Sequence, residues 1–161
     1  MGEHEMPCYT VGIEIGVKAE RAFQYLADPE KLGMWALGCF DTRPADEKGL
    51  FKGRSLFDGS ETFVRIEAEE RRLLIDYHVG DRERQVPRIF TRVVPGPDYG
   101  ADPGHCLVVM TAWRTKDMSE ARWRRLCASH DAEILMIQTQ LESECTSREQ
   151  QMASVRPSEE T

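Results

Sequence analysis

The chain lacks the features that mark several specialised classes of protein. Among its 161 residues, no apolar run approaches the roughly 18 residues that a membrane-spanning helix needs. The start, MGEHEM, is charged and has no apolar core, so we expect no secretion signal. Gly2 does not predict myristoylation, because Met6 stands where that motif requires Ser or Thr.

The cysteines also exclude two kinds of structure. There are five, an odd number, and no pair is spaced as CxxC. A disulfide framework or a zinc site is therefore not expected, and no metal ligand is assigned. Free thiols are typical of the reducing cytoplasm, which we expect to be the compartment. The five are Cys8, Cys39, Cys106, Cys127 and Cys145.

Motifs of the large enzyme classes are missing as well. The sequence contains no GxSxG, HExxH, Walker or GxGxxG pattern, so hydrolase, kinase and dehydrogenase chemistry is disfavoured and no cofactor is predicted. The formal net charge of −7 disfavours nucleic acid as a partner, since phosphate binding needs a concentrated basic surface. The length indicates one domain with a sizeable core.

The N-terminal third shows one strand and two short helices. Residues 9–15 alternate β-branched or aromatic residues with polar or small ones, which is typical of a half-buried strand. Residues 18–27 then follow helical spacing. Asp28 and Pro29 end that helix and begin another, with Trp35 on its apolar side.

Six further strands and a long helix follow. Links after residue 49 are mostly of hairpin length, and Asp58-Gly59 predicts a tight turn, so antiparallel pairing is favoured. The expected strands are 37–42, 50–57, 62–68, 73–79, 88–94 and 105–115. Asp117 and Glu120 form a capping-box pattern for a helix over 118–144. Residues 146–161 are polar and predict a solvated tail.

Local sequence at the start strengthens this interpretation. The strand around Val11–Val17, the segment AERAFQYLADPE at 19–30 and Trp35 together resemble the N-terminal signature of the START-like (SRPBCC) superfamily, and of its polyketide cyclase/dehydrase-like subgroup. The resemblance covers roughly residues 8–144. This chain has Lys18-Ala19 where members often have Ala-Pro.

Element order and resemblance agree on an α+β helix-grip fold. We predict a seven-stranded curved antiparallel sheet wrapped around the long C-terminal helix, with two short helices between strands one and two. The domain would span 8–145, followed by the tail at 146–161. A sheet curled around one helix tends to enclose a cavity between the two.

Residues that would line this cavity are apolar or aromatic and point inward. Tyr77 shares a strand face with Leu73 and Ile75. On the last strand, Met110 is favoured over Trp113 as the inward residue, although the strand face that contains Trp113 is nearly as apolar as the face that contains Met110. The alternative for many of these residues is simple core packing. The ligand-binding candidates are Trp35, Ile66, Tyr77, Phe90, Met110, Cys127, His130 and Ile134.

Two of these candidates could also move protons. His130 lies in the apolar stripe of the long helix, where it could bind a carbonyl or act as a general base, or else be a satisfied core histidine. Tyr77 would be its partner if the protein is an enzyme. Arginines on the late strands could clamp an acidic group, but a charged outer face is favoured, and Arg122, Arg124 and Arg125 are expected in solvent. The strand arginines are Arg82, Arg84, Arg88, Arg92 and Arg114.

Three functions follow. The first is binding of a hydrophobic small molecule, of lipid, polyketide or aromatic type, in the cavity. The second, implied by the resemblance, is a polyketide cyclase or dehydratase using the same cavity. The third, also implied by it, is a protein-interaction module like the chaperone cofactors of the superfamily. The sequence leaves a homodimer open.

Overall fold

The computed structural model describes residues 7–154, which form one seven-stranded sheet with three α-helices. The strands are β1 (Cys8–Ile15), β2 (Phe40–Pro44), β3 (Phe51–Arg54), β4 (Glu61–Glu69), β5 (Leu74–Gly80), β6 (Gln85–Pro95) and β7 (Cys106–Trp113). The helices are α1 (Ala19–Ala27), α2 (Pro29–Trp35) and α3 (Glu120–Ser154), with short 3₁₀ turns at η1 (Glu70–Arg72) and η2 (Gly96–Tyr99).

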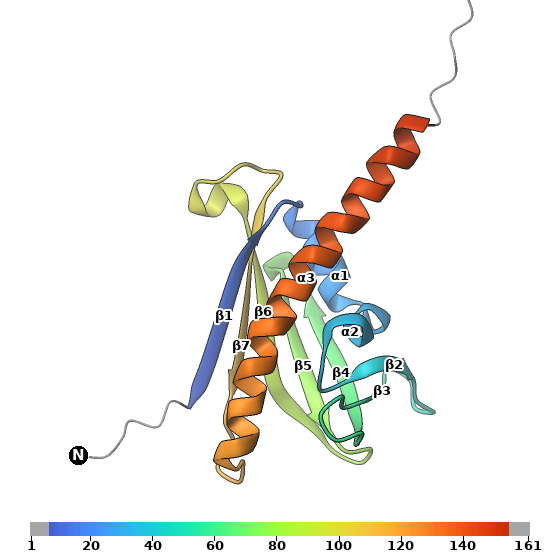
Figure 1. Ribbon diagram of the computed structural model, residues 1–161, viewed down its shortest axis with the longest axis vertical. Helices are drawn as coiled ribbons and strands as arrows, with labels where there is room; N and C mark the ends of the chain where they lie inside the picture. The colour runs from blue at the N-terminus through green and yellow to red at the C-terminus, as the bar shows by residue number, and fades with distance from the viewer. Residues whose placement is uncertain (1–6, 155–161) are drawn as a thin grey trace, which may run out of the picture.

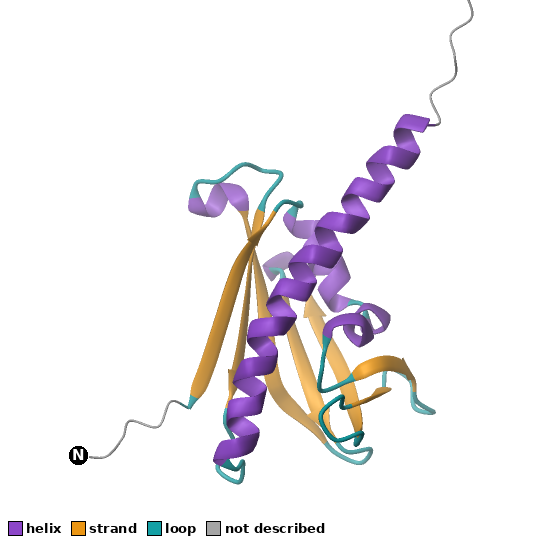
Figure 2. Ribbon diagram, in the orientation of Figure 1, coloured by secondary structure: helices purple, strands orange, loops and turns teal. Residues whose placement is uncertain are grey.

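The sheet is antiparallel throughout and has the order β1-β7-β6-β5-β4-β3-β2. Six strands form a meander, and β1 joins its end beside β7. The helix α3 runs diagonally in front of the sheet (Figures 1 and 2), while α1 and α2 connect β1 to β2. The predicted α+β helix-grip arrangement is therefore confirmed.

The junction between α1 and α2 forms as its sequence predicts. The Asp28 carboxylate accepts a hydrogen bond from the backbone N–H of Glu30 at 2.9 Å, and Pro29 occupies the first turn of α2. Proline suits this position because its missing N–H would have no partner within the helix. The junction places Leu32 and Trp35 on the buried side of α2.

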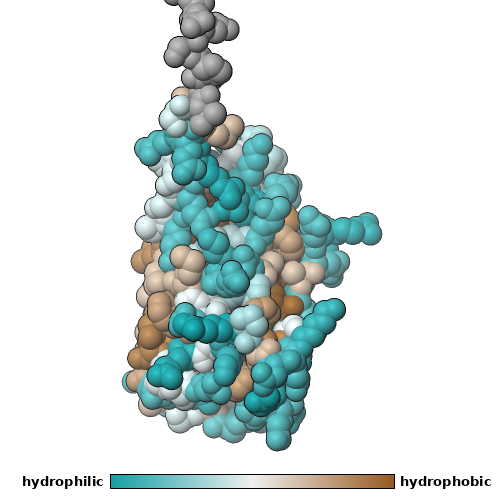
Figure 3. Space-filling view, turned by 90° about the vertical axis from the view of Figure 1, so that its right-hand side faces the viewer, coloured by the Kyte–Doolittle hydropathy of each residue, from teal (hydrophilic) through white to brown (hydrophobic). Residues whose placement is uncertain are grey.

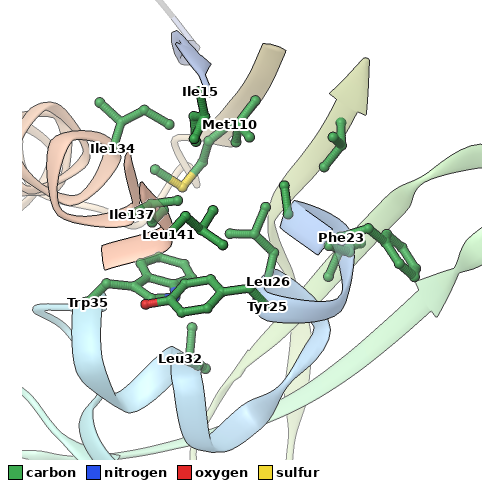
Figure 4. Close-up of a cluster of buried hydrophobic side chains, with 14 of the residues drawn as sticks. Ile15, Phe23, Tyr25, Leu26, Leu32, Trp35, Met110, Ile134, Ile137 and Leu141 are labelled. Atoms are coloured by element: carbon green, nitrogen blue, oxygen red, sulfur yellow. The ribbon is translucent and has the colours of Figure 1, made fainter. Parts of the chain in front are cut away.

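The hydrophobic core lies between the concave face of the sheet, α1 and α3 (Figure 4). Leu26 from α1 and Ile137 and Leu141 from α3 are fully buried. On β7 the fully buried residues include Val108 and Met110, so the face containing Met110 points inward.

Hydrogen bonds fix α3 alongside β1. The Tyr9 hydroxyl donates to Asp131 at 2.6 Å, and the Gln138 side-chain amide donates to the Glu14 carbonyl at 2.8 Å. Farther along, Glu144 forms ion pairs with Arg21 of α1 and Lys31 of α2. These contacts hold α3 from Asp131 to Glu144 against β1, α1 and α2.

Both ends of α3 differ from the prediction. Ser119, not Asp117, caps the helix, since its hydroxyl accepts from the Arg122 N–H at 3.3 Å. The helix also continues past Glu144 to Ser154, although the side chains from Thr146 onward are exposed. Extending an existing helix costs far less than starting one, so a polar sequence can continue it without an apolar contact.

We still propose residues 8–145 as the folded domain, because burial ends at Cys145. Residues 146–154 are an exposed helical extension, and 155–161 lie outside the described residues. Among the described residues, no helix combines the length and apolarity needed to cross a bilayer.

Candidate functional site

A cavity of about 470 Å³ lies between the N-terminal half of α3 and the strands β4, β5 and β6. Its apolar side comes from Leu32, Trp35, Ala36, Cys39, Phe57, Val64, Tyr77, Val79, Ile89, Met118 and Leu126. Its polar side comes from Ser55, Asp58, Ser60, Thr62, Arg88, Arg122, Arg125, Ser129, His130 and Glu133, with Gly38 between them. Helix, sheet and the β3–β4 loop thus all contribute walls.

Two aromatic rings form one wall. Trp35 and Tyr77 pack edge to face, with ring centroids 6.0 Å apart and an interplanar angle of 82°. The Tyr77 hydroxyl donates to the Leu26 carbonyl at 2.7 Å. Burial is the main cause that raises the pKa of Tyr77 far above its usual value. Tyr77 therefore gives the cavity an aromatic surface, and its proton is held by the backbone.

A buried acid and base lie side by side on α3. His130 Nε2 is 3.7 Å from Glu133 Oε2, and both residues are almost completely buried. The other oxygen of Glu133 accepts from the Leu37 N–H at 2.8 Å, just after α2. His130 Nδ1 has no hydrogen-bond partner among residues 7–154. His130 lines the cavity, but this nitrogen is shielded, and a buried polar atom without a partner is unusual in a folded protein.

Burial sets the protonation of this pair. It lowers the pKa of His130 to about 4, with Asp131 opposing the shift. It raises the pKa of Glu133 to about 7, with the Leu37 N–H opposing. At neutral pH the histidine is uncharged and the carboxyl is near its titration midpoint. The two groups can then exchange a proton with a bound molecule without forming an ion pair.

Three arginines line the part of the cavity near the start of α3. Arg88 reaches the cavity from β6, and Arg122 and Arg125 reach it from α3. Arg125 also lies 5.7 Å from the ring centroid of Phe57 in the β3–β4 loop. In that loop, hydrogen bonds from Ser60 are the main cause that lowers the pKa of Asp58.

The predicted ligand-binding residues fall into two groups. Trp35, Tyr77 and His130 line the cavity. Ile66, Met110 and Ile134 belong to or pack against the hydrophobic core, and Cys127 is half-buried on α3. Phe90 lies on the other face of the sheet against Trp113, with ring centroids 6.4 Å apart, because Ile89 occupies the inward position on β6.

Sequence reasoning missed Glu133, and the outer face that it favoured for the strand arginines is wrong for Arg88. Glu133 lies three residues after His130, so the two share a helix face, and that spacing was the available signal. Arg88 is the strand arginine that faces the cavity, whereas Arg92 and Arg82 are exposed as expected for an outer face. Arg122, Arg124 and Arg125 are all exposed, as expected, and Arg122 and Arg125 also line the cavity.

Comparison with known proteins gives a structural likeness only. No protein-family model matches the chain, and no curated protein matches it in sequence. The aromatase/cyclase Zhui from Streptomyces sp. R1128 superposes with a TM-score of 0.61 at 12% identity, covering 86% of this chain and 94% of Zhui. The chain has the helix-grip fold. This is the fold that the sequence resemblance implied.

Two other helix-grip structures extend the comparison. The di-domain aromatase/cyclase BexL, from the BE-7585A biosynthetic pathway, has a TM-score of 0.64 at 13% identity, over 85% of this chain and 47% of BexL. Aha1 from Colwellia psychrerythraea, solved as a dimer, has a TM-score of 0.61 at 15% identity, over 85% of this chain and 97% of Aha1. The fold therefore accommodates cyclases and proteins of other kinds.

Proposed function

We propose that this protein binds a hydrophobic small molecule in the cavity between α3 and the sheet. The observation that supports this most directly is the volume of about 470 Å³, which lies within the range of ligand-sized sites. Aliphatic residues and the Trp35–Tyr77 pair supply apolar contact, and the polar side chains of the lining supply hydrogen-bonding groups. Cyclases among the structural neighbours are consistent with an apolar ligand.

Filling the cavity tests this proposal. Val79 lines it from β5, and Val79→Phe should weaken binding of the neutral dye Nile red by about tenfold or more, because the added ring occupies the ligand volume. The measurement is a fluorescence titration, supported by native mass spectrometry of freshly expressed protein.

Val109→Phe is the matched control, since Val109 lies on the other face of the sheet from the buried Val108 and Met110. It should leave dye affinity unchanged. The proposal fails if the wild-type chain binds neither the dye nor any apolar molecule, or if both variants weaken binding equally.

A second candidate is a cyclase or dehydratase, favoured by the buried His130–Glu133 pair. In such a reaction a base removes the proton from a carbon beside a carbonyl. That carbon bonds to a second carbonyl, whose oxygen takes up a proton, and water is then lost. His130 and Glu133 are placed to move these protons, whereas the Tyr77 hydroxyl is bound to Leu26.

A linear triketone that can close to an aromatic diol with loss of water tests this second candidate. We expect His130→Ala and Glu133→Gln each to slow product formation about a hundredfold, as for loss of a general acid or base, while Tyr77→Phe keeps most of the rate. Product is followed by chromatography. A wild-type rate equal to that of buffer alone would rule this candidate out.

The interaction-module alternative gains little support from the one face of the molecule that Figure 3 shows. The face shown in Figure 3 is mainly hydrophilic, with apolar residues interspersed among polar ones. A homodimer stays a proposal, for which the dimeric neighbour Aha1 is the supporting observation. The cytoplasm stays the proposed compartment, supported by five cysteines that form no disulfide.

A further inference from the structure

The cavity is electrically uneven along α3. Arg122 and Arg125 are near the start of the helix, and His130 and Glu133 are one to three turns farther along. At 1.5 Å per residue, Arg122 and Glu133 are about 16 Å apart along the helix axis. Arg88 of β6 shares the lining with the two helix arginines.

Asp117 interacts electrostatically with Arg88 and Arg122, and Asp58 with Arg125, but neither carboxylate is in a direct ion pair with them. Among residues 7–154, none of the three forms an ion pair within 4.0 Å of a carboxylate, and Asp58 is the acidic residue of the lining besides Glu133. Arg125 makes its cation–π contact with Phe57 instead. The chain as a whole carries a net charge of −7. The group of arginines at this end of the cavity therefore contrasts with the acidic charge of the molecule as a whole.

Arg88 is the least satisfied of the three. Its Nη1 atom is buried and has no hydrogen-bond partner among the described residues. Burial, followed by the charge of Arg122, lowers the pKa of Arg88, and Asp117 only partly offsets this. A partly buried guanidinium without a close carboxylate partner is costly, and an anion bound by its other nitrogens would offset part of that cost.

We infer that the ligand is an amphipathic anion whose carboxylate or phosphate group binds Arg88 and Arg122 while its apolar part fills the cavity. This inference rests on the proposed function, since it assigns a chemical class to the same ligand. Guanidinium groups bind both kinds of anion through paired N–H donors. The negative group would lie at the arginine end, away from the ionisable Glu133, and the apolar part would contact Trp35 and Tyr77.

A ligand series with one constant alkyl chain tests the inference. Dodecanoate, dodecyl phosphate and dodecanol are compared at pH 8 by displacement of Nile red, below their micelle concentrations. At least one of the two anions should bind about tenfold or more tightly than the alcohol, with an advantage that shrinks in high salt. The two anions compared with each other tell carboxylate from phosphate.

Variants then assign the effect to the arginines. Arg88→Gln and, independently, Arg122→Gln should each reduce the preference for the anion to about threefold or less, with dodecanol affinity retained. Circular dichroism checks that both variants fold. Arg124→Gln is the matched control, because its side chain is 79% exposed and pairs with Glu120 on the surface. It should keep the full preference.

The outcomes separate the two proposals. If dodecanol binds as tightly as both anions, the anion inference is wrong and apolar binding stands. If neither the dye nor any member of the series binds, the proposed function itself is wrong. An anion preference that survives both Arg88→Gln and Arg122→Gln overturns the assignment to these residues.

Discussion

Glu133→Gln is expected to stabilise the folded chain at pH 8 by about 3 kcal/mol, a figure that follows from its shifted pKa. Burial raises the pKa of Glu133 from 4.5 to about 7. The folded chain therefore holds this proton up to a higher pH than the unfolded chain does. The contribution of Glu133 to the free energy of unfolding therefore falls as pH rises from 4.5 to 7 and levels off above that. Replacing the ionisable carboxyl with an amide restores the stability lost at high pH.

The structure allows this substitution with little disturbance. Glutamine keeps a side-chain oxygen that can accept the Leu37 N–H, and it has nearly the same shape as glutamate. Urea denaturation at pH 8 and at pH 5 measures the effect. At pH 5 the gain should shrink to about 1 kcal/mol or less, because the carboxyl is protonated in the folded chain.

The pH dependence due to His130 is distinct from that of Glu133, and an exposed glutamate provides the control. Burial lowers the pKa of His130 from 6.5 to about 4, so its contribution is lost as pH falls between these values, opposite in sign to that of Glu133. At pH 8 it is neutral in both states and contributes no pH dependence. Glu149→Gln, on the exposed end of α3, should change stability by less than about 0.5 kcal/mol. Equal effects of the two glutamine variants would contradict the burial argument.

Gly33→Ala should destabilise the chain by about 3 kcal/mol, or lower the melting temperature by about 10 °C. A Cβ atom at Gly33 would overlap the backbone nitrogen of Thr42 in β2. Backbone cannot rotate aside as a side chain can, so α2 would have to move. The same helix carries Leu32 and Trp35 to the cavity, and we expect Nile red binding to weaken as well.

Gly38→Ala is the control for this substitution. Gly38 lies five residues farther along, after α2, and a Cβ atom there would meet nothing within 4 Å among the described residues. Its melting temperature should stay within about 2 °C of the wild type. Thermal unfolding followed by circular dichroism compares the two. If both alanine variants melt like the wild type, the close packing of α2 on β2 does not determine stability.

Periodicity carried most of the fold prediction. Alternation located each strand to within a few residues, and Asp58-Gly59 marked a turn in which Gly59 has a φ of 73°. Signals of this kind are local, so one sequence reveals them. The end of α3 could not be located in this way, because an exposed polar helix has no apolar period to read.

The site was harder to predict because it depends on which face a side chain takes. On β6, a shift by one residue exchanges Ile89 for Phe90, and both are apolar enough to be inside. A β-bulge between β5 and β6 adds a register shift that the sequence does not mark. Glu133 is charged, and burial of a charged residue is exceptional, so its helical spacing from His130 was too weak a signal to place it inside.

The pairing of β1 with β7 has a consequence for how the chain folds. Cys8 pairs with Trp113, so β1 and β7 are far apart in the sequence and can pair only after most of the domain has been made. Strands β2 to β7, in contrast, each pair with the next strand along the chain. During synthesis, the first strand of this domain to be made is thus the last to gain its neighbour. Until then its unpaired edge is open to mispairing with other strands.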